Sequence, residues 1–294
     1  PLVYSIPMII LIGWRGEIQD NGEQLKDEPQ HKKQGELTLK QLDLLGIPFV
    51  IIDKNCKDIN EIIIKARDDS ILRSGPIAIV VRKGSFSFFS LEKKDGQKYE
   101  MSREDVLEKI VEHMPKEWPF VCTTGVASRE LFEIRKRNHH GHSRDFLTVG
   151  GMGHASSIAA GIAPNLVGRK VICIDGDGSA LMHLGALAIN ADCSNLIHIL
   201  INNEVHDSVG GQPTKGSIIN FSKVGSLLGY KHCTKVETAE DLKSELIKSR
   251  DAIGSILIEV SCNPGFRSNL SRPDRTPIEN KNDFMNFLGK KNEK

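Results

Sequence analysis

The sequence contains no long apolar run and no excess of one charge, and these absences exclude several classes of protein. Its apolar opening, residues 1–14, contains two prolines and is too short to span a membrane, and it lacks the basic start and cleavage site of a signal peptide. Lysine and arginine total 39 against 38 aspartates and glutamates, and no basic stripe is interleaved with aromatic residues. We therefore expect neither a membrane nor a nucleic acid among its partners.

The six cysteines form no C-x-x-C pair, which argues against a zinc site or a disulfide framework. Several of them lie inside apolar runs, where buried and reduced thiols are the simpler interpretation. We therefore expect a cytoplasmic protein. The cysteines are Cys56, Cys122, Cys173, Cys193, Cys233 and Cys262.

Short apolar runs alternate with helix-period segments along most of the 294 residues. Runs of this kind that alternate with helices are typical of parallel sheets covered on both faces, so we predict an α/β protein with two doubly wound domains. A polar, lysine-rich stretch at residues 82–102 separates two series of strands, and we assign domains to 1–90 and 103–294 with a linker at 91–102. The predicted strands are 7–13, 48–52, 76–81, 120–124, 146–150, 170–175, 196–202 and 255–261, and one helix is predicted over 179–190.

Polar residues follow two of these strands at the points where the strands end. Gly176, Asp177 and Gly178 follow strand 170–175, and Asn203 follows strand 196–202. Parallel strands end at the same edge of a sheet, where α/β folds bind ligands. One carboxylate and one amide oxygen suit Mg²⁺ that also binds a diphosphate. Glycines let the backbone approach phosphate oxygens, although Gly-Asp-Gly alone is also compatible with a plain turn.

Together, Gly176-Asp177-Gly178 and Asn202-Asn203 resemble the metal-binding motif of thiamine-diphosphate enzymes. Longer segments are similar to phosphonopyruvate decarboxylases: 26–39, 122–135, 144–163 and 205–214. The resemblance implies two domains of the thiamine-diphosphate-binding fold, with Mg²⁺ and thiamine diphosphate as cofactors. It also implies that Val205 offers its carbonyl to the metal beside Asp177 and Asn203.

The same resemblance assigns cofactor-binding roles to four further residues. Thr124 and Ser179 are expected near the diphosphate, and Ser179 opens a helix whose N-terminal amides attract anions. Gly150 is expected to accept a hydrogen bond from the aminopyrimidine. Met152 is expected to be the apolar wedge between the two rings of the cofactor, although a plain core role is the alternative.

His31 and His206 are the candidates for proton transfer during loss of CO₂ from a 2-keto acid. A substrate with a second anionic group also needs cationic or amide donors, for which we consider Arg15, Lys26 and His154. The reaction expected from the resemblance is decarboxylation of phosphonopyruvate to phosphonoacetaldehyde. Decarboxylation of sulfopyruvate or another 2-keto acid is the first alternative, and a non-catalytic cofactor-binding subunit is the second.

The resemblance implies an activating glutamate upstream of strand 7–13, and this chain shows none there. Glu17, Glu23 and Glu28 lie downstream of the expected position. The first domain is therefore expected to be incomplete, as the C-terminal half of a pyrimidine-binding domain. Either the sequence is a fragment or a partner chain supplies the missing half, and we expect a homo-oligomer.

Overall fold

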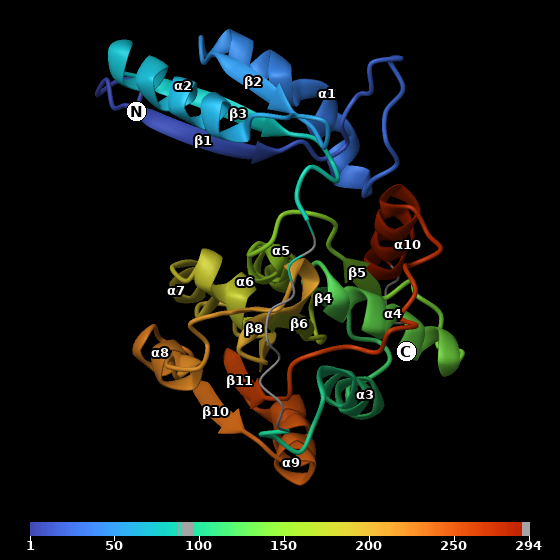
Figure 1. Ribbon diagram of the computed structural model, residues 1–294. Coiled ribbons are helices and arrows are strands. Elements are labelled where there is room, and N and C mark those ends of the chain that lie inside the picture. The colour runs from blue at the N-terminus through green and yellow to red at the C-terminus, as the bar shows by residue number, and fades with distance from the viewer. Residues whose placement is uncertain (88, 90–96, 290–294) are drawn as a thin grey trace. The chain divides into compact units, whose positions relative to one another are not determined.

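The computed structural model describes residues 1–87, 89 and 97–289, and it divides into two compact units, Pro1–Ser90 and Leu91–Lys294 (Figure 1). Unit 1 contains a parallel sheet with the order β1 (Met8–Gly13), β3 (Pro76–Val81) and β2 (Phe49–Ile52). Two helices, α1 (Pro29–Leu44) and α2 (Ile59–Leu72), accompany these strands.

The two helices of unit 1 cover opposite faces of its sheet because the side chains of β3 alternate between them. Ala78 and Val80 pack with Leu42 of α1, whereas Ile77 and Ile79 pack with Ala66 of α2. The central strand is therefore buried on both faces, as a doubly wound sheet requires.

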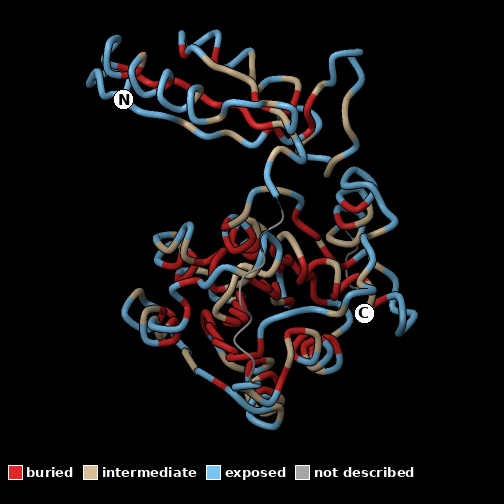
Figure 2. Tube along the Cα trace, viewed as in Figure 1, coloured by how far each residue is buried: buried red, intermediate tan, exposed pale blue. Residues whose placement is uncertain are grey.

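Unit 2 contains a parallel sheet of six strands in the order β10-β11-β7-β6-β4-β5. Its central strands lie in the red, buried part of the chain trace (Figure 2). The strands are β4 (Phe120–Cys122), β5 (Asp145–Leu147), β6 (Val171–Gly176), β7 (Leu196–Asn202), β10 (His232–Val236) and β11 (Ile256–Ser261), with a separate pair of β8 (Val205–His206) and β9 (Gln212–Pro213). The helices are α3 (Arg103–His113), α4 (Val126–Arg137), α5 (Ala155–Ile162), α6 (Asp177–Met182), α7 (Ala186–Asn190), α8 (Phe221–Leu227), α9 (Ala239–Asp251) and α10 (Pro277–Gly289).

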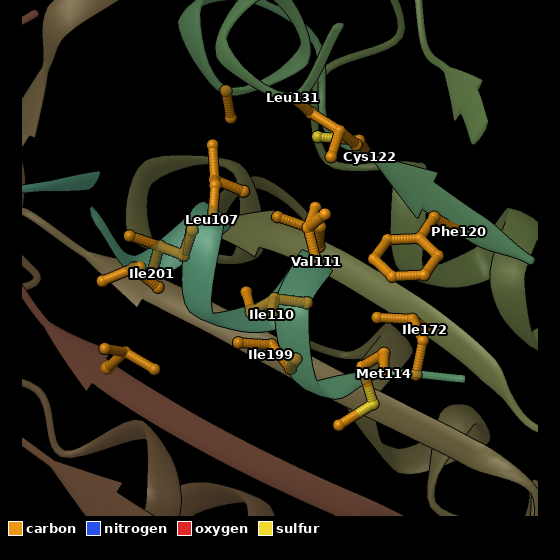
Figure 3. Packing of buried hydrophobic residues seen from close by; sticks show 14 of the residues in the cluster. Leu107, Ile110, Val111, Met114, Phe120, Cys122, Leu131, Ile172, Ile199 and Ile201 are labelled. Atoms are coloured by element: carbon orange, nitrogen blue, oxygen red, sulfur yellow. The ribbon is translucent and has the colours of Figure 1, made fainter. Parts of the chain in front are cut away.

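Helices cover both faces of the larger sheet as well. Figure 3 shows α3 packing on one face, where Leu107 and Ile110 meet Ile172 and Ile199 of the central strands. Helices α4 and α9 contribute to the same cluster, whereas α5 and α10 pack on the opposite face. The predicted α/β class with parallel, doubly wound sheets is therefore confirmed.

Two sequence predictions differ from the structure in detail. The helix predicted over 179–190 begins at Asp177 and is interrupted after Met182, because His183 has φ −136° and leaves the helical range. The strand predicted over 146–150 ends at Leu147, and the next residue, Thr148, still bonds the Cys122 carbonyl of β4 through its backbone N–H at 3.1 Å and its hydroxyl at 2.7 Å. Of the predicted linker 91–102, residues 91–96 lie outside the described part of the chain.

Within the described residues, no helix combines the length and the hydropathy needed to cross a bilayer.

Candidate cofactor and metal site

The predicted metal ligands lie around one cavity of unit 2, at the carboxyl ends of β6 and β7. These strands are parallel neighbours, with Gly176 beside Ile201. Asp177 is the next residue after β6 and Asn203 the next after β7, so the topology brings both to one edge. The cavity is lined by Arg103, Thr123, Thr124, Val126, Ala127, Met152, Asp175, Gly176, Asp177, Gly178, Ser179, Ile201, Asn203, Val205, His206, Asp207, Ser208 and Val209.

Asp177 is the buried carboxylate of this cavity, with 2% of its surface exposed. Burial raises its pKa, whereas a hydrogen bond from the Thr214 hydroxyl and the nearby His206 imidazole oppose that rise. A carboxylate that has lost its water gains from a cation placed against it. Asp177 therefore has the surroundings of an anionic metal ligand.

Gly216 lies against Asp177 and leaves no room for a side chain of its own. At Gly216 a Cβ would collide with Oδ2 of Asp177 and Oδ1 of Asn202. This Asn202 oxygen is buried and has no hydrogen-bond partner among the described residues. Polar atoms left in this state usually have water or an ion as partner. Only glycine fits at position 216, and the buried Asn202 oxygen beside Asp177 remains an unsatisfied acceptor.

The available donors are those that Mg²⁺ prefers. Asp177 offers a carboxylate, Asn203 an amide oxygen and Val205 a main-chain carbonyl, all at one cavity. Among the described residues no three His, Cys, Asp or Glu side chains gather as a metal-binding group. The oxygen donors present fit Mg²⁺, and the metal assignment stays a prediction.

Asn203 is oriented by charged residues that the sequence analysis missed. Its Nδ2 donates to Oδ2 of Asp207 at 2.7 Å, and Arg103 donates to the same oxygen at 2.7 Å. The buried Arg103 also pairs with Glu130 at 2.7 Å. Burial lowers the pKa of Arg103, but the carboxylates of Glu130 and Asp207 raise it above its ordinary value. The Asn203 oxygen accepts a long hydrogen bond from the Val205 N–H at 3.5 Å, and a second lone pair remains for another ligand.

Ser179 joins three segments of the predicted diphosphate site. Its hydroxyl oxygen accepts hydrogen bonds from Thr123 and from the Gly153 backbone, each at 3.0 Å. Thr124, the predicted neighbour of the diphosphate, lines the same cavity, but Thr123 makes the contact with Ser179. Thr123 and Thr124 are adjacent, and the sequence alone does not indicate which of them contacts Ser179.

The loop that contains Gly150 and Met152 has a backbone that ordinary residues rarely adopt. Gly150 and Gly151 have φ of +68° and +54°, in the left-handed region. The half-buried Met152 that follows lines the cavity. The loop thus presents one large apolar side chain beside Asp177 and Ser179, as expected of a wedge, and its role stays a prediction.

His206 lies with the metal-site residues, whereas His31 belongs to unit 1. The half-buried His206 imidazole packs on Gly178, where a Cβ would lie 2.5 Å from its Cε1. On α1, His31 lies 3.1 Å from Oδ1 of Asp27. The other carboxylate oxygen of Asp27, Oδ2, accepts a hydrogen bond from Arg15 at 2.8 Å. Both histidines keep their predicted roles as untested proton-transfer candidates.

The other candidates for binding an anionic substrate group differ in their contacts. Arg15 is already paired with Asp27, and its side chain is largely exposed. His154 is exposed near Met152, and its ring lies 4.3 Å from that of His183. Lys26 is exposed in unit 1. Sequence reasoning did not single out His183, because the histidine follows a helix whose interruption was not predicted.

Comparison with known proteins bears on the family of the chain. A family model described as thiamine pyrophosphate enzyme, C-terminal TPP binding domain, matches residues 122–260. The chain is 31% identical to a phosphonopyruvate decarboxylase from Streptomyces viridochromogenes over 96% of its own length and 73% of that protein. It is 36% identical to a sulfopyruvate decarboxylase subunit beta from Methanothermobacter thermautotrophicus over 49% of its own length and 74% of the subunit.

A solved structure shows the same fold. The benzoylformate decarboxylase from Polynucleobacter necessarius matches with a TM-score of 0.50 and 20% identity, over 63% of this chain and 37% of the decarboxylase. At that identity the likeness supports the fold alone. The family model and the identity to decarboxylases over nearly the whole chain carry the assignment further. The chain belongs to the thiamine-diphosphate-dependent decarboxylase family of carboxy-lyases.

Proposed function

We propose that the chain takes part in Mg²⁺- and thiamine-diphosphate-dependent decarboxylation of phosphonopyruvate to phosphonoacetaldehyde and CO₂. The observation that carries this proposal is the placement of Asp177, Asn203 and Val205 around one cavity. The 31% identity to a phosphonopyruvate decarboxylase over 96% of the chain supports the substrate. Residues 103–294 would form the diphosphate-binding domain, and 1–90 the C-terminal half of a pyrimidine-binding domain.

The protein's own residues would bind, orient and exchange protons. Asp177, Asn203 and the Val205 carbonyl would hold Mg²⁺, and Thr124, Gly176, Gly178 and Ser179 would surround the diphosphate. When bound, thiamine diphosphate supplies the electron sink that loss of CO₂ from a 2-keto acid requires. His206, next to the metal ligands, would exchange the proton that replaces CO₂ on the product, and His31 is the second candidate for that role. Gly150 and Met152 would orient the cofactor rings.

Sulfopyruvate is the competing substrate, because a sulfopyruvate decarboxylase subunit is 36% identical over 49% of the chain. Phosphonate and sulfonate differ in one anionic head group, so the two substrates need to be compared directly. Steady-state kcat/KM on both acids, with the whole protein, Mg²⁺ and thiamine diphosphate, tests the proposal. A clear preference for sulfopyruvate would overturn the substrate assignment, and cofactor binding without turnover on either acid would favour a non-catalytic subunit.

We further propose that another polypeptide segment, from a second copy or a partner chain, covers β1 of unit 1 in a cytoplasmic assembly. The sheet ends at this strand, and Leu11 exposes 61% of its surface. Met8 and Ile9 are exposed on the same strand. An apolar edge strand that remains open invites pairing with another strand. The mass of the native assembly tests this proposal, because a stable monomer would contradict it.

A further inference from the structure

Glu204 lies between the proposed metal ligands Asn203 and Val205, and its backbone is in the left-handed region. Its φ is +66°, a conformation that disfavours side chains larger than glycine. Among the described residues, three others that are not glycine have a positive φ, namely Ser5, Ser74 and His139, and none of them adjoins the cavity. Strained backbone persists where neighbouring contacts hold it.

The Glu204 side chain is held by two residues far away in the sequence. Its Oε1 accepts a hydrogen bond from Lys98 at 2.7 Å and another from the Tyr99 hydroxyl at 2.9 Å. Lys98 and Glu204 form an ion pair. The left-handed turn therefore has a charge-assisted anchor.

The anchor is itself fixed to the sheet. Oδ1 of the buried Asn263 accepts from the backbone N–H groups of Lys98 and Tyr99, each at 2.9 Å, and its Nδ2 donates to the Tyr99 carbonyl at 2.6 Å. Asn263 is the second residue after β11, which ends at Ser261. Lys98 and Tyr99 thus hold Glu204 from a rigid support.

The Glu204 backbone connects this anchor to the metal site. Its carbonyl accepts from the Thr214 N–H at 2.7 Å, and the Thr214 hydroxyl donates to Asp177. Displacing Glu204 would therefore disturb Asn203 and Val205 directly and Asp177 through Thr214. These three residues supply all the oxygens proposed to bind Mg²⁺.

We propose that Glu204 is a positioning residue for the Mg²⁺ site, anchored by Lys98 and Tyr99 so that Asn203 and Val205 face Asp177. This inference rests on the proposed function, because it takes these three residues as the metal ligands. Glu204 itself does not touch the metal. It acts by holding the turn that presents its two neighbours, as residues behind the direct ligands commonly do.

The test is Mg²⁺ affinity of the whole protein, measured by calorimetry at a fixed concentration of thiamine diphosphate. Glu204→Ala removes the anchor and keeps the strain, so we expect the Mg²⁺ Kd to rise about ten- to hundredfold. Glu204→Gln keeps an oxygen acceptor but loses the charge opposite Lys98, so it should raise the Kd less than Glu204→Ala. Glu204→Gly removes the anchor but relieves the strain, so its Kd should lie between those of the wild type and Glu204→Ala. Tyr99→Phe leaves Glu204 in place and should raise the Kd less than Glu204→Ala.

Glu245 provides a matched control on α9. Its side chain is 23% exposed against 24% for Glu204, and it also accepts from a lysine, Lys248 at 2.7 Å, and from a hydroxyl, Thr234 at 3.2 Å. Glu245→Ala should lower the melting temperature of the metal-free protein as Glu204→Ala does, but leave the Mg²⁺ Kd unchanged. A purely structural role for Glu204 would give the same result for both variants and would overturn the inference.

Asp177→Ala separates this inference from the proposed function. If the wild type binds Mg²⁺, Asp177→Ala does not, and Glu204→Ala matches the wild type, then the metal site stands and the positioning role is wrong. If the wild type and Asp177→Ala are equally unable to bind, both the proposed metal site and the role of Glu204 are overturned.

Discussion

The two units differ in how completely they bury their sheets. In unit 2, β6 and β7 are central strands with buried residues on both faces, and the polar site begins only where they end. In unit 1, β3 is equally buried, but β1 at the edge leaves Leu11 exposed. The larger unit therefore completes a core and places its polar cavity at the strand ends, whereas the smaller unit leaves apolar side chains of β1 exposed.

The charged groups of the units differ in the same way. Arg103 and Glu130 form a buried pair beside the cavity of unit 2. In unit 1, Arg15 pairs with Asp27, but its guanidinium is largely in solvent. A buried pair depends on both partners, whereas an exposed pair contributes little, so equivalent substitutions should have unequal effects.

The largest expected effect is loss of cofactor binding when Asp177 is changed. Asp177→Ala removes the carboxylate proposed to hold Mg²⁺, and we expect Mg²⁺-dependent binding of thiamine diphosphate to disappear in calorimetry. The fold should survive, because this side chain borders a cavity rather than filling the core. Normal cofactor binding by the variant would show that the site of unit 2 lies elsewhere.

Breaking the buried Arg103–Glu130 ion pair should have the largest effect on stability. Arg103→Met leaves the Glu130 carboxylate buried without its partner, and we expect a loss of about 3–5 kcal/mol in the free energy of unfolding. Urea denaturation of the whole protein measures this loss. Arg15→Met in unit 1 is the comparison, with an expected loss below about 1 kcal/mol. Similar losses for the two variants would show that exposure does not distinguish the two pairs.

The sequence predicted the parts of the site that depend on local order. Asp177 and Asn203 were predictable because each directly follows a strand, and parallel neighbouring strands end at one edge. The glycines around Met152 were visible as a motif, and their positive φ values agree with close backbone approach. These inferences need only the neighbours of each residue along the chain.

Contacts between distant segments were not predictable from the sequence. Lys98 and Glu204 are separated by 106 positions, and nothing in the sequence marks either as the partner of the other. Glutamate is also an unexpected residue at a left-handed position, where glycine would have been a recognisable signal. Likewise, the Asp207 carboxylate that accepts from Asn203 also accepts from Arg103, a distant residue at the start of α3.

If another segment covers the edge strand β1 of unit 1, a substitution there should lower the free energy of unfolding more than the exposure of β1 implies. We expect Leu11→Lys to lower the free energy of unfolding of the whole protein by about 1–3 kcal/mol, because a charge would then be buried at an apolar contact. Leu72→Lys on α2 is the control, since Leu72 is 87% exposed and a surface change should stay within about 0.5 kcal/mol. Equal small effects in urea denaturation would show that solvent covers β1.

The smallest expected effect is a change of stability at low pH. One carboxylate in each unit, Asp27 and Glu133, has a pKa below its usual range. In unit 1, the hydrogen bond from Arg15 holds the pKa of Asp27 well below its usual range, against a smaller opposing effect of burial. In unit 2, burial tends to raise the pKa of Glu133, but hydrogen bonds from Ser271 and Arg267 lower it to about 2. A carboxyl with a pKa lower in the folded than in the unfolded state binds its proton more readily when the chain unfolds. Its stabilising contribution is therefore present above about pH 4.3, the unfolded pKa of glutamate, and is lost as the pH falls toward the folded value.

Glu133→Gln and Asp27→Asn test this dependence in the two units. Each variant should be less stable than the wild type at pH 6, and the difference should shrink as the pH is lowered toward 3 in urea denaturation. Asp27 should show the decline at slightly lower pH than Glu133, because the ordinary pKa of aspartate is lower. A difference that stays constant from pH 6 to pH 3 would mean that shape, rather than charge, stabilises these positions.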